Sequence, residues 1–369
     1  MPLSRIQPTQ YASLLRDKVA ATCALLAPFA APAPEVFPSP PTGFRMRAEF
    51  RIWHEGGDLD YVMFNPADPK TPVPIAEFPI ACATIQQLMP ALRDRLQSSD
   101  TLRRKLFQVE FLSTLAGDSL VTLVYHRKLD SAWENSAEQL RAELQSIAPQ
   151  LSVIGRSRKQ KLVLGRDWVL EELPIAGRDF TYRQYEQAFT QPNALVNIAM
   201  IGWACERAAG LGGDLLELYC GNGNFTLPLS RQFDAVIATE LAKVSVRAAQ
   251  HNIEANGTDN VQMIRLAAEE VTQAMNGVRE FRRLANLPRP LGDYDLRTIF
   301  VDPPRAGLDE HTVAMAAGFD NIIYISCNPH TLADNLQQLD KTHRIEKFAL
   351  FDQFPYTDHM ECGVFLRRR

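Results

Sequence analysis

The sequence lacks the features that mark several large classes of protein. No apolar run reaches the roughly 18 residues that a membrane-spanning helix requires. The start of the chain has no basic region followed by an apolar core and a small-residue cleavage site, so we expect no secretory signal. These absences favour a cytoplasmic protein that makes no contact with membranes.

Cysteine is scarce, and its spacing excludes the common metal sites. No Cys-x-x-Cys pair occurs, so neither a zinc ribbon nor an iron–sulfur cluster is indicated, and we expect no metal. Most of the six cysteines should therefore be reduced residues of the core. They are Cys23, Cys82, Cys205, Cys220, Cys327 and Cys362.

Positive charge is not in excess overall, but it is unevenly distributed. The net charge is −4, which by itself argues against a nucleic-acid-binding protein. The basic residues nevertheless gather in the first half of the chain, although a solvated face would explain any one cluster. The clusters are Arg45, Arg47 and Arg51; residues 103–105; residues 126–128; and Arg156, Arg158, Lys159 and Lys161.

A mostly apolar run at 215–219 leads through Gly221 and Gly223 into a helical pattern that begins at Phe225. A strand, a glycine-rich turn and a helix N-terminus together form a typical nucleotide site, because glycine lets the backbone approach a ligand. A second apolar run, 235–239, ends at Glu240, where a carboxylate can accept hydrogen bonds from ribose hydroxyls. The alternative is a tight turn that binds nothing.

The details of this motif favour one cofactor over others. The third glycine of a dinucleotide fingerprint is missing, and so is the Gly-x-x-x-x-Gly-Lys-Ser/Thr pattern of a P-loop. The acidic residues Glu217 and Glu240 suit a nucleoside that carries a charged amino acid. We therefore predict S-adenosylmethionine (S-adenosyl-L-methionine) rather than NAD.

The hydrophobic pattern divides the chain, whose 369 residues are too many for one ordinary domain. Helical spacing over 8–27 precedes a proline-rich stretch, 27–42, which we expect to be an extended connector. Alternating patterns then predict an antiparallel α+β domain with one basic face, followed by a doubly wound α/β domain. The predicted segments are 1–43, 44–184 and 185–369, with strands of the last at 215–219, 235–240, 261–266, 298–302, 322–326, 347–351 and 362–367.

Chemically useful side chains follow the strands of the α/β domain, where ligands of such sheets bind. Asp302 ends one strand and is followed by Pro303 and Pro304, which fix the loop. Cys327 leaves the next strand just before Asn328 and Pro329. This position favours a nucleophilic thiolate over an inert buried cysteine.

Glu361 opens the last predicted strand. If that strand is antiparallel to the others, its start lies at the edge where they end, near Cys327 and Asp302. A thiolate and a carboxylate beside a methyl donor suit methylation of carbon 5 of uracil, which is too weak a nucleophile on its own. Cys327 would add to carbon 6, and Glu361 would remove the carbon-5 proton after methyl transfer. A surface glutamate is the alternative.

Four motifs resemble the RNA uridine-5-methyltransferase family: Leu-Leu-Glu-Leu-Tyr-Cys-Gly-Asn-Gly-Asn from Leu215, Phe-Val-Asp-Pro-Pro-Arg from Phe300, Ile-Ser-Cys-Asn-Pro from Ile325, and Met-Glu-Cys-Gly from Met360. The likeness also covers the stretches 45–53 and 351–356, and within the family it favours the bacterial tRNA members. It implies an RNA-binding domain that is followed in the sequence by a class I Rossmann-like S-adenosylmethionine-dependent methyltransferase domain.

The resemblance implies roles for individual residues. Cys327 and Glu361 would be catalytic, and the cofactor contacts would come from Gln191, Tyr219, Gly221, Asn224, Glu240 and Asp302. Phe107 and His126 match positions in the RNA-binding half, where an aromatic ring can stack on an unpaired base, and Arg45 and Arg51 lie in the same half. The implied substrate is the T-loop uridine of tRNA, position fifty-four, in the T arm. A T-like loop of transfer-messenger RNA is a second substrate, and we expect a monomer.

Three other functions stay open at this point. A ribosomal-RNA member of the family is one, although the oligonucleotide-binding domain and iron–sulfur cysteines that several of those carry are not seen. An amino-group methyltransferase with an Asp-Pro-Pro motif is another, but Arg305 stands where such enzymes usually have an aromatic residue. The third is an RNA-folding factor that opens the tRNA elbow, with methylation secondary.

Overall fold

The computed structural model describes residues 5–65 and 68–369, and these form two compact units. Of the described residues, unit 1 contains 5–8, most of Pro40–Glu172, and Gln184–Ala194. Unit 2 contains Thr9–Ser39, Leu173–Arg183 and Leu195–Arg369. Residues 9–39 of the predicted N-terminal segment, 1–43, group with the C-terminal half of the chain. None of the helices in the described ranges is long and apolar enough to cross a membrane.

Unit 1 is built on a seven-stranded sheet with the order β4-β3-β2-β5-β6-β7-β8. Neighbouring strands are antiparallel, as predicted, except that β6 and β7 are parallel. The helix α4 (Ser131–Leu144) connects this parallel pair, which a short turn could not join. The strands are β2 (Arg47–Glu55), β3 (Asp58–Asn65), β4 (Asp68–Pro74), β5 (Leu106–Ser113), β6 (Asp118–Tyr125), β7 (Gln150–Ser157) and β8 (Gln160–Leu164).

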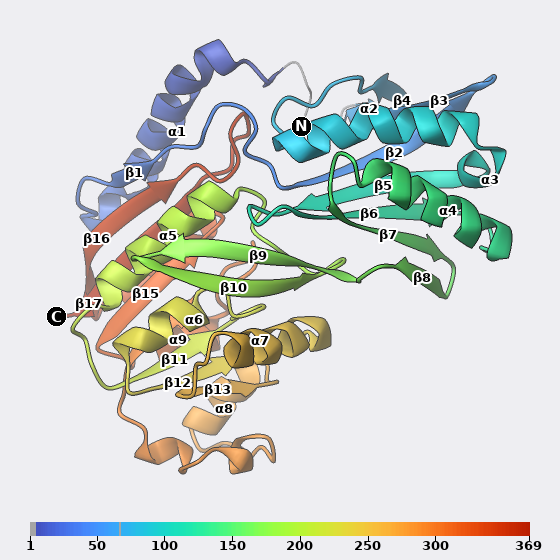
Figure 1. Cartoon of the computed structure of the whole chain (residues 1–369). Coiled ribbons are helices and arrows are strands. Elements are labelled where there is room, and N and C mark those ends of the chain that lie inside the picture. Colours follow the sequence, from blue (N-terminus) through green and yellow to red (C-terminus); the bar gives the residue numbers. More distant parts are fainter. Residues whose placement is uncertain (1–4, 66–67) are drawn as a thin grey trace. The chain divides into compact units, whose positions relative to one another are not determined.

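The helices of unit 1 cover one face of its sheet (Figure 1). The helix α2 (Ala83–Ser98) contacts β3 and β5, α4 contacts β7 and β8, and the short α3 (Asp100–Arg103) lies between them in sequence. Trp133 of α4 is fully buried against Gly155 of β7, where an added Cβ atom would stand 2.2 Å from the indole ring. Only glycine leaves room for that ring, so this contact sets how closely α4 approaches the sheet.

Unit 2 contains an eight-stranded sheet with the order β1-β16-β17-β15-β14-β11-β12-β13. Only β17 is antiparallel to its neighbours, β15 and β16, which confirms the conditional prediction made for the last strand. The other pairs are parallel. The strands are β1 (Glu35–Phe37), β11 (Asp214–Leu218), β12 (Ala235–Thr239), β13 (Val261–Ile264), β14 (Leu296–Val301), β15 (Asn321–Ser326), β16 (His343–Phe351) and β17 (Glu361–Arg368).

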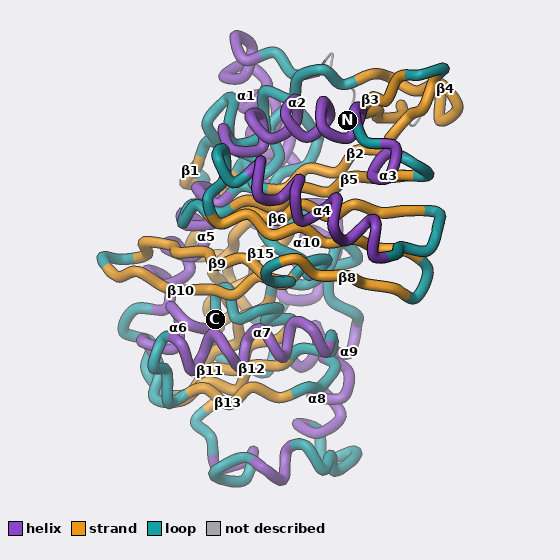
Figure 2. Tube along the Cα trace, turned by 45° about the vertical axis from the view of Figure 1, so that its right-hand side comes forward, coloured by secondary structure: helices purple, strands orange, loops and turns teal. Residues whose placement is uncertain are grey.

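Both faces of this sheet are covered by helices, as Figure 2 shows by the purple coils around its strands. Cys362, Val364 and Leu366 of β17 pack in one core with Leu26 of α1, whereas Gly363 faces Trp203 of α5 on the other side. This alternation is expected of a buried strand, whose successive side chains point to opposite faces. The helices are α1 (Tyr11–Leu26), α5 (Ala194–Ala208), α6 (Thr226–Leu229), α7 (Lys243–Ala255), α8 (Ala268–Met275), α9 (Glu310–Ala316) and α10 (Pro329–Leu339).

The proline-rich stretch is more ordered than an extended connector. It contains a 3-10 turn, Ala27–Phe29, and β1, which adds a parallel edge strand beside β16. Phe37 stacks on Phe351 with ring centroids 4.8 Å apart. The three-residue strand was not predicted, because a pairing this short leaves no periodic pattern in the sequence.

A two-stranded sheet of β9 (Trp168–Ile175) and β10 (Arg178–Tyr185) was also not predicted. Its residues are divided between the two units, since the chain passes from unit 1 to unit 2 and back through it.

Candidate active site

The glycine-rich turn of unit 2 has the backbone conformation that the sequence indicated. Gly221 and Gly223 have φ angles of 58° and 87°, in the left-handed region that favours glycine. Tyr219 has φ 60°, which is uncommon for a bulky residue and is associated with functional sites. A Cβ atom added at Gly221 would meet nothing within 4 Å, so the turn presents open backbone on that side.

Glu240 lies directly after β12 and is tied to this turn. Its Oε2 accepts a hydrogen bond from the Gly221 backbone N–H at 3.2 Å. Its Oε1 accepts from the N–H groups of Leu241 at 2.7 Å and Ala242 at 2.6 Å. The carboxylate is therefore held at the carboxyl end of the sheet, beside the turn, where the prediction required it.

Asn224 forms a reciprocal amide pair with Asn197. The Asn197 amide donates to Asn224 Oδ1 at 2.9 Å, and the Asn224 amide donates to Asn197 Oδ1 at 2.8 Å. The Tyr182 hydroxyl also donates to the Asn224 carbonyl at 3.0 Å. Asn197 is buried on α5, and sequence reasoning missed it because one polar residue in an apolar helix carries no motif. The pair orients the predicted cofactor contact.

Two buried carboxyl groups lie behind the turn and at the end of β14. Burial raises the pKa of Glu217 to about 8, and the Asp302 carboxyl adds to this rise. Burial also raises the pKa of Asp302 to about 7. Pro303 and Pro304 follow Asp302, as expected for a rigid loop at this edge. Near neutral pH Glu217 is therefore largely protonated and Asp302 is partly protonated.

Cys327 directly follows β15 and is half-buried. Burial, together with the carboxyl groups of Glu361 and Asp302, raises the pKa of its thiol to about 11, while Arg305 opposes this rise. Asn328 fixes the loop, since its amide donates to the Arg305 carbonyl at 3.1 Å and its Oδ1 accepts from the His330 N–H at 3.1 Å. The ends of β14 and β15 are thereby joined.

Glu361 begins β17 and is 3% exposed. Burial raises its pKa well above the ordinary value, and Asp302 adds to the rise, whereas Arg305 lowers it. Glu361 Oε2 makes no hydrogen bond to any residue that the structure describes. The predicted proximity of Glu361, Asp302 and Cys327 is thus confirmed, because each carboxyl acts electrostatically on the thiol.

Arg305 is a site residue to which the sequence motifs assign no chemical role. Its guanidinium contacts the His359 ring, with Nη2 2.7 Å from Nδ1. Burial, followed by the charge of Arg305, lowers the pKa of His359. Arg305 is the cation that lowers the pKa of both Cys327 and Glu361. Its place directly after two prolines was the available signal.

The remaining predicted residues belong to unit 1. Gln191 lies in the segment Gln184–Ala194, so its contact with the cofactor stays a prediction. Arg51 and Phe107 form a stack with a guanidinium-to-ring distance of 3.8 Å, and the rings of Phe107 and His126 are 4.1 Å apart. Arg45 does not belong to this stack; its backbone forms isolated β-bridges with Ala81 and Asn193. RNA binding by these four residues also stays a prediction.

No group of three or more histidine, cysteine, aspartate or glutamate residues in the described ranges could hold a metal ion. The donor set at the edge of the sheet, with an open glycine turn, a fixed carboxylate and an amide pair, suits an organic cofactor instead.

Comparison with known proteins agrees with this geometry. The model of the tRNA (Uracil-5-)-methyltransferase family matches residues 10–369. A tRNA/tmRNA (uracil-C(5))-methyltransferase of Aromatoleum aromaticum is 54% identical over 369 residues, covering 100% of this chain and 98% of its own. One of Pseudomonas entomophila, with the same name, is 56% identical over 362 residues and covers 98% of each chain.

Among solved structures, the tRNA (uracil-54, C5)-methyltransferase of Pyrococcus abyssi, crystallised with S-adenosyl-L-homocysteine, superposes with a TM-score of 0.71. It is 21% identical and covers 96% of this chain and 83% of its own. The similarity confirms the predicted fold, a Rossmann-like methyltransferase domain. Together with the family match over nearly the whole chain, these findings confirm the enzyme class and the family inferred from the motifs. The chain belongs to the tRNA (uracil-5-)-methyltransferase family.

Proposed function

We propose that this protein methylates carbon 5 of the T-loop uridine of tRNA, position fifty-four, and the corresponding uridine of transfer-messenger RNA. The observation that carries the proposal is the meeting of Cys327, Glu361 and Asp302 at the carboxyl edge of one sheet. The names of the two bacterial relatives support the RNA substrates. We place the protein in the cytoplasm, where these RNAs are, and expect it to act as a monomer.

S-adenosylmethionine would supply an electrophilic methyl group on a sulfonium. The residues that would hold it are Tyr219, Gly221, Asn224, Glu240 and Asp302, and the family resemblance adds Gln191. The open side of the Gly221 turn leaves backbone room for a ligand, and the fixed Glu240 carboxylate can accept ribose hydroxyls. The partly neutral Asp302 becomes a stronger acceptor once a cation lies near it.

The reaction begins when Cys327 forms a bond from Sγ to carbon 6 of the uracil. With a pKa of about 11, the thiol is almost entirely protonated at neutral pH, so it first gives its proton to solvent, and the thiolate then adds to carbon 6. Arg305 favours the thiolate electrostatically. Addition places negative charge on the uracil enolate, and carbon 5 becomes nucleophilic enough to take the methyl group.

Glu361 then completes the cycle as the general base. It removes the proton from carbon 5, the carbon 5–carbon 6 double bond re-forms, and the bond to Cys327 Sγ breaks. A buried carboxylate whose pKa lies well above the ordinary value is a strong base once it is ionised. Glu361 Oε2 has no hydrogen-bond partner among the described residues, so this oxygen can accept that proton.

The uridine must leave its stack before Cys327 can reach carbon 6. An unpaired loop base can stack on aromatic and guanidinium planes, and the Arg51–Phe107–His126 stack of unit 1 offers both. We propose that this stack, with Arg45 nearby in sequence, binds the loop.

A methyl-transfer assay tests the proposal. Labelled S-adenosylmethionine is incubated with an unmodified tRNA transcript, with a twin carrying cytidine at the T-loop position, and with a ribosomal-RNA fragment. Label in the first RNA alone, recovered as 5-methyluridine, is the expected result. Label in both tRNAs would indicate amino-group methylation or another position, and label in the ribosomal fragment alone would indicate the ribosomal alternative.

The RNA-folding alternative is separated by a refolding assay with the Cys327→Ala protein. Refolding of tRNA by this inactive variant would show an activity independent of methylation, and its absence would leave catalysis as the only role.

A further inference from the structure

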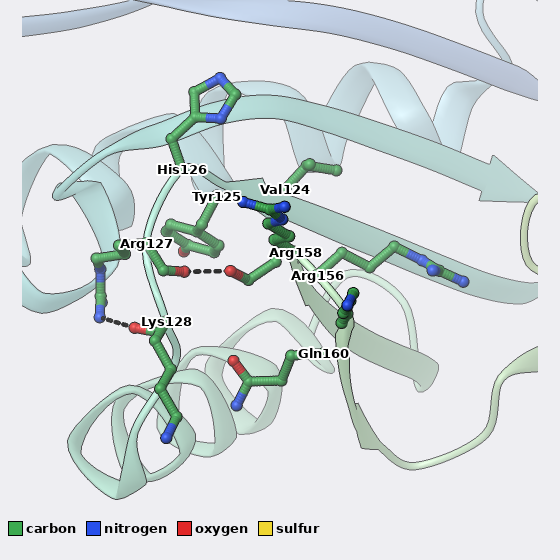
Figure 3. Close-up of a pocket in the computed structure, with 10 residues that line it drawn as sticks. Val124, Tyr125, His126, Arg127, Lys128, Arg156, Arg158 and Gln160 are labelled. Atoms are coloured by element: carbon green, nitrogen blue, oxygen red, sulfur yellow. Dashed lines mark hydrogen bonds between the residues drawn. The ribbon is translucent and has the colours of Figure 1, made fainter.

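A basic hollow lies at one edge of the unit 1 sheet, and His126 is the only residue discussed above as a predicted site residue that lines it. Its volume is about 870 Å³, and residues 124–128 and 156–160 line it. The first segment leaves β6 and the second forms the turn between β7 and β8. Figure 3 shows the two segments side by side, with the side chains of His126, Lys128 and Arg156 pointing in different directions.

Hydrogen bonds make the frame of this hollow rigid. The Gln160 amide donates to the Leu129 carbonyl at 2.8 Å, and its Oε1 accepts from the Leu129 N–H at 2.9 Å. The Ser157 hydroxyl donates to the Arg127 carbonyl. Arg127 itself donates to three backbone carbonyls, those of Thr101, Arg104 and Lys128. The loop after β6 is therefore bound to the β7–β8 turn before any ligand arrives.

The cations of the hollow fall into two classes. Arg156 is ion-paired with Glu186, and Lys161, just outside the hollow, lies 3.2 Å from the same carboxylate. Burial raises the pKa of Glu186, but the hydrogen bond from Arg156 outweighs this effect and lowers the pKa overall. The carboxylate therefore stays ionised, and its charge is balanced by Arg156. Lys128, Arg158 and Lys159 are exposed, and their side chains have no ion-pair or hydrogen-bond partner within residues 5–65 and 68–369.

The turn itself holds a cation at a strained position. Ser157 pairs with Gln160, so Arg158 and Lys159 form a two-residue connection. Lys159 has φ 60°, a conformation that glycine or asparagine adopts more easily and that costs a lysine roughly 1 kcal/mol. A charged residue kept where glycine would relax the backbone is consistent with a use for the charge.

The surroundings indicate which anion these cations fit. His126 lines the hollow, and its ring centroid lies 4.1 Å from that of Phe107, so the basic surface continues from the place where a base would stack. The cationic groups spread apart instead of converging on one point, which suits a chain of spaced charges better than one small anion.

We propose that Lys128, Arg158 and Lys159 bind the phosphodiester backbone of the RNA next to the nucleotide that stacks on Phe107. The inference rests on the proposed function, because it takes the same RNA as its ligand. Contacts to phosphates fix the position of the RNA without reading its sequence. The hollow would thus hold the T arm in register while base identity is read elsewhere.

The test compares tRNA binding by the wild-type protein, Arg158→Gln/Lys159→Gln, Lys128→Gln and the control Lys70→Gln. Lys70 lies in β4 at the opposite edge of the same sheet and is also exposed. With a salt slope of about 0.7–0.9 per phosphate, each lost contact raises Kd about five- to eightfold at 0.1 M salt. The double variant should therefore bind roughly 25- to 60-fold more weakly, with a shallower slope.

Two further readouts keep this test separate from that of the proposed function. In methyl-transfer kinetics the double variant should raise KM for tRNA and leave kcat within about twofold, while Lys70→Gln changes neither. Transcripts with single neutral methylphosphonate linkages around the T-loop uridine should weaken wild-type binding at one or two linkages. The double variant should lose that sensitivity, since the two changes remove the same contact.

The inference is overturned if the double variant and Lys128→Gln keep the wild-type Kd and salt slope, or if Lys70→Gln weakens binding as much as they do. If the wild-type protein binds tRNA through these residues but transfers no methyl group, the proposed function is wrong and the inferred binding surface is still supported.

Discussion

Cys327 and Glu361 face each other across the antiparallel pair of β15 and β17. Ser326 of β15 pairs with Cys362 of β17, Cys327 directly follows Ser326, and Glu361 directly precedes Cys362. The strand order thus brings a thiol and a carboxyl that are 34 positions apart to facing places at one edge of the sheet. Each carries a raised pKa, because Glu361 is buried, Cys327 is half-buried, and the Asp302 carboxyl acts on both. The predictions below begin from this relationship.

Replacing Cys327 with alanine should abolish both methylation and the covalent protein–RNA adduct. Since the thiol forms the bond to carbon 6, the rate should fall by roughly 10⁴-fold or more. Denaturing gels with 5-fluorouridine-substituted tRNA report the adduct, and labelled cofactor reports turnover. Cys362→Ala, a buried neighbour outside the proposed chemistry, is the matched control. Full methylation by Cys327→Ala would eliminate the covalent mechanism.

Replacing Glu361 with glutamine should separate the two halves of the reaction. Addition and methyl transfer can proceed, but the carbon-5 proton cannot be removed, so adduct should accumulate while release of 5-methyluridine slows by about 10²–10⁴-fold. The same gels, run over time with unmodified tRNA, follow the adduct. Loss of adduct and methylation together would mean that Glu361 acts earlier or only structurally.

Removing the charge of Arg305 should make Cys327 less acidic. Arg305 opposes the rise in the pKa of the thiol, so Arg305→Leu should move that pKa above about 11. Alkylation of the free enzyme by iodoacetamide, whose rate follows the thiolate fraction, should then be slower at every pH below the new value, by tenfold for each unit of displacement.

Arg305→Lys keeps the positive charge and serves as the control for that measurement. It should retain most of the alkylation rate of the wild-type protein. Equal rates for the wild type and Arg305→Leu between pH 7 and 10 would show that the guanidinium does not act on the thiol.

Lys18 joins α1 to the segment that leads into β17. Its Nζ donates to Asp352 Oδ1 at 2.5 Å and to the Phe354 carbonyl at 3.2 Å, and Asp352 is fully buried. Lys18→Met would leave a buried carboxylate without its cation, which costs about 3–5 kcal/mol. Urea unfolding should report that loss, whereas Arg16→Met on the exposed side of the same helix should change stability by less than about 0.5 kcal/mol.

Glu171 in unit 1 should make stability depend on pH. Burial raises its pKa from the ordinary 4.5 to about 7, although the Leu115 N–H donates to its Oε1 at 2.8 Å. The folded state therefore holds this proton more tightly than the unfolded state. Its contribution is fully present below pH 4.5 and is lost as pH rises to about 7, amounting to about 3 kcal/mol at most.

Glu171→Gln should flatten that part of the stability profile, because the amide does not titrate. Urea midpoints measured at pH 5 and pH 7.5 for both proteins check this. The shifted pKa predicts that the stability of the wild-type protein relative to Glu171→Gln falls between pH 5 and pH 7.5. An unchanged or larger relative stability at pH 7.5 would contradict it.

The sequence by itself determined the strands of unit 2 and the residues at their ends. Buried parallel strands are short apolar runs, and their carboxyl ends share one edge, so Glu240, Asp302 and Cys327 could be placed from pattern alone. The glycine turn was equally local, since Gly221 and Gly223 need only their own φ angles. The motifs then predicted the family.

Only the tertiary structure decided the contacts between distant segments. The sequence could say that Glu361 approaches Cys327 only if β17 is antiparallel, and the insertion of β17 between β15 and β16 settled it. The Asn197–Asn224 amide pair and the Lys18–Asp352 ion pair had no signal in the sequence, and the basic clusters around Lys128 and Arg158 gave no sign that they meet in one hollow. Each joins side chains on separate elements, and such pairings leave no periodicity, because hydrophobic pattern reports which face is buried and not what it meets.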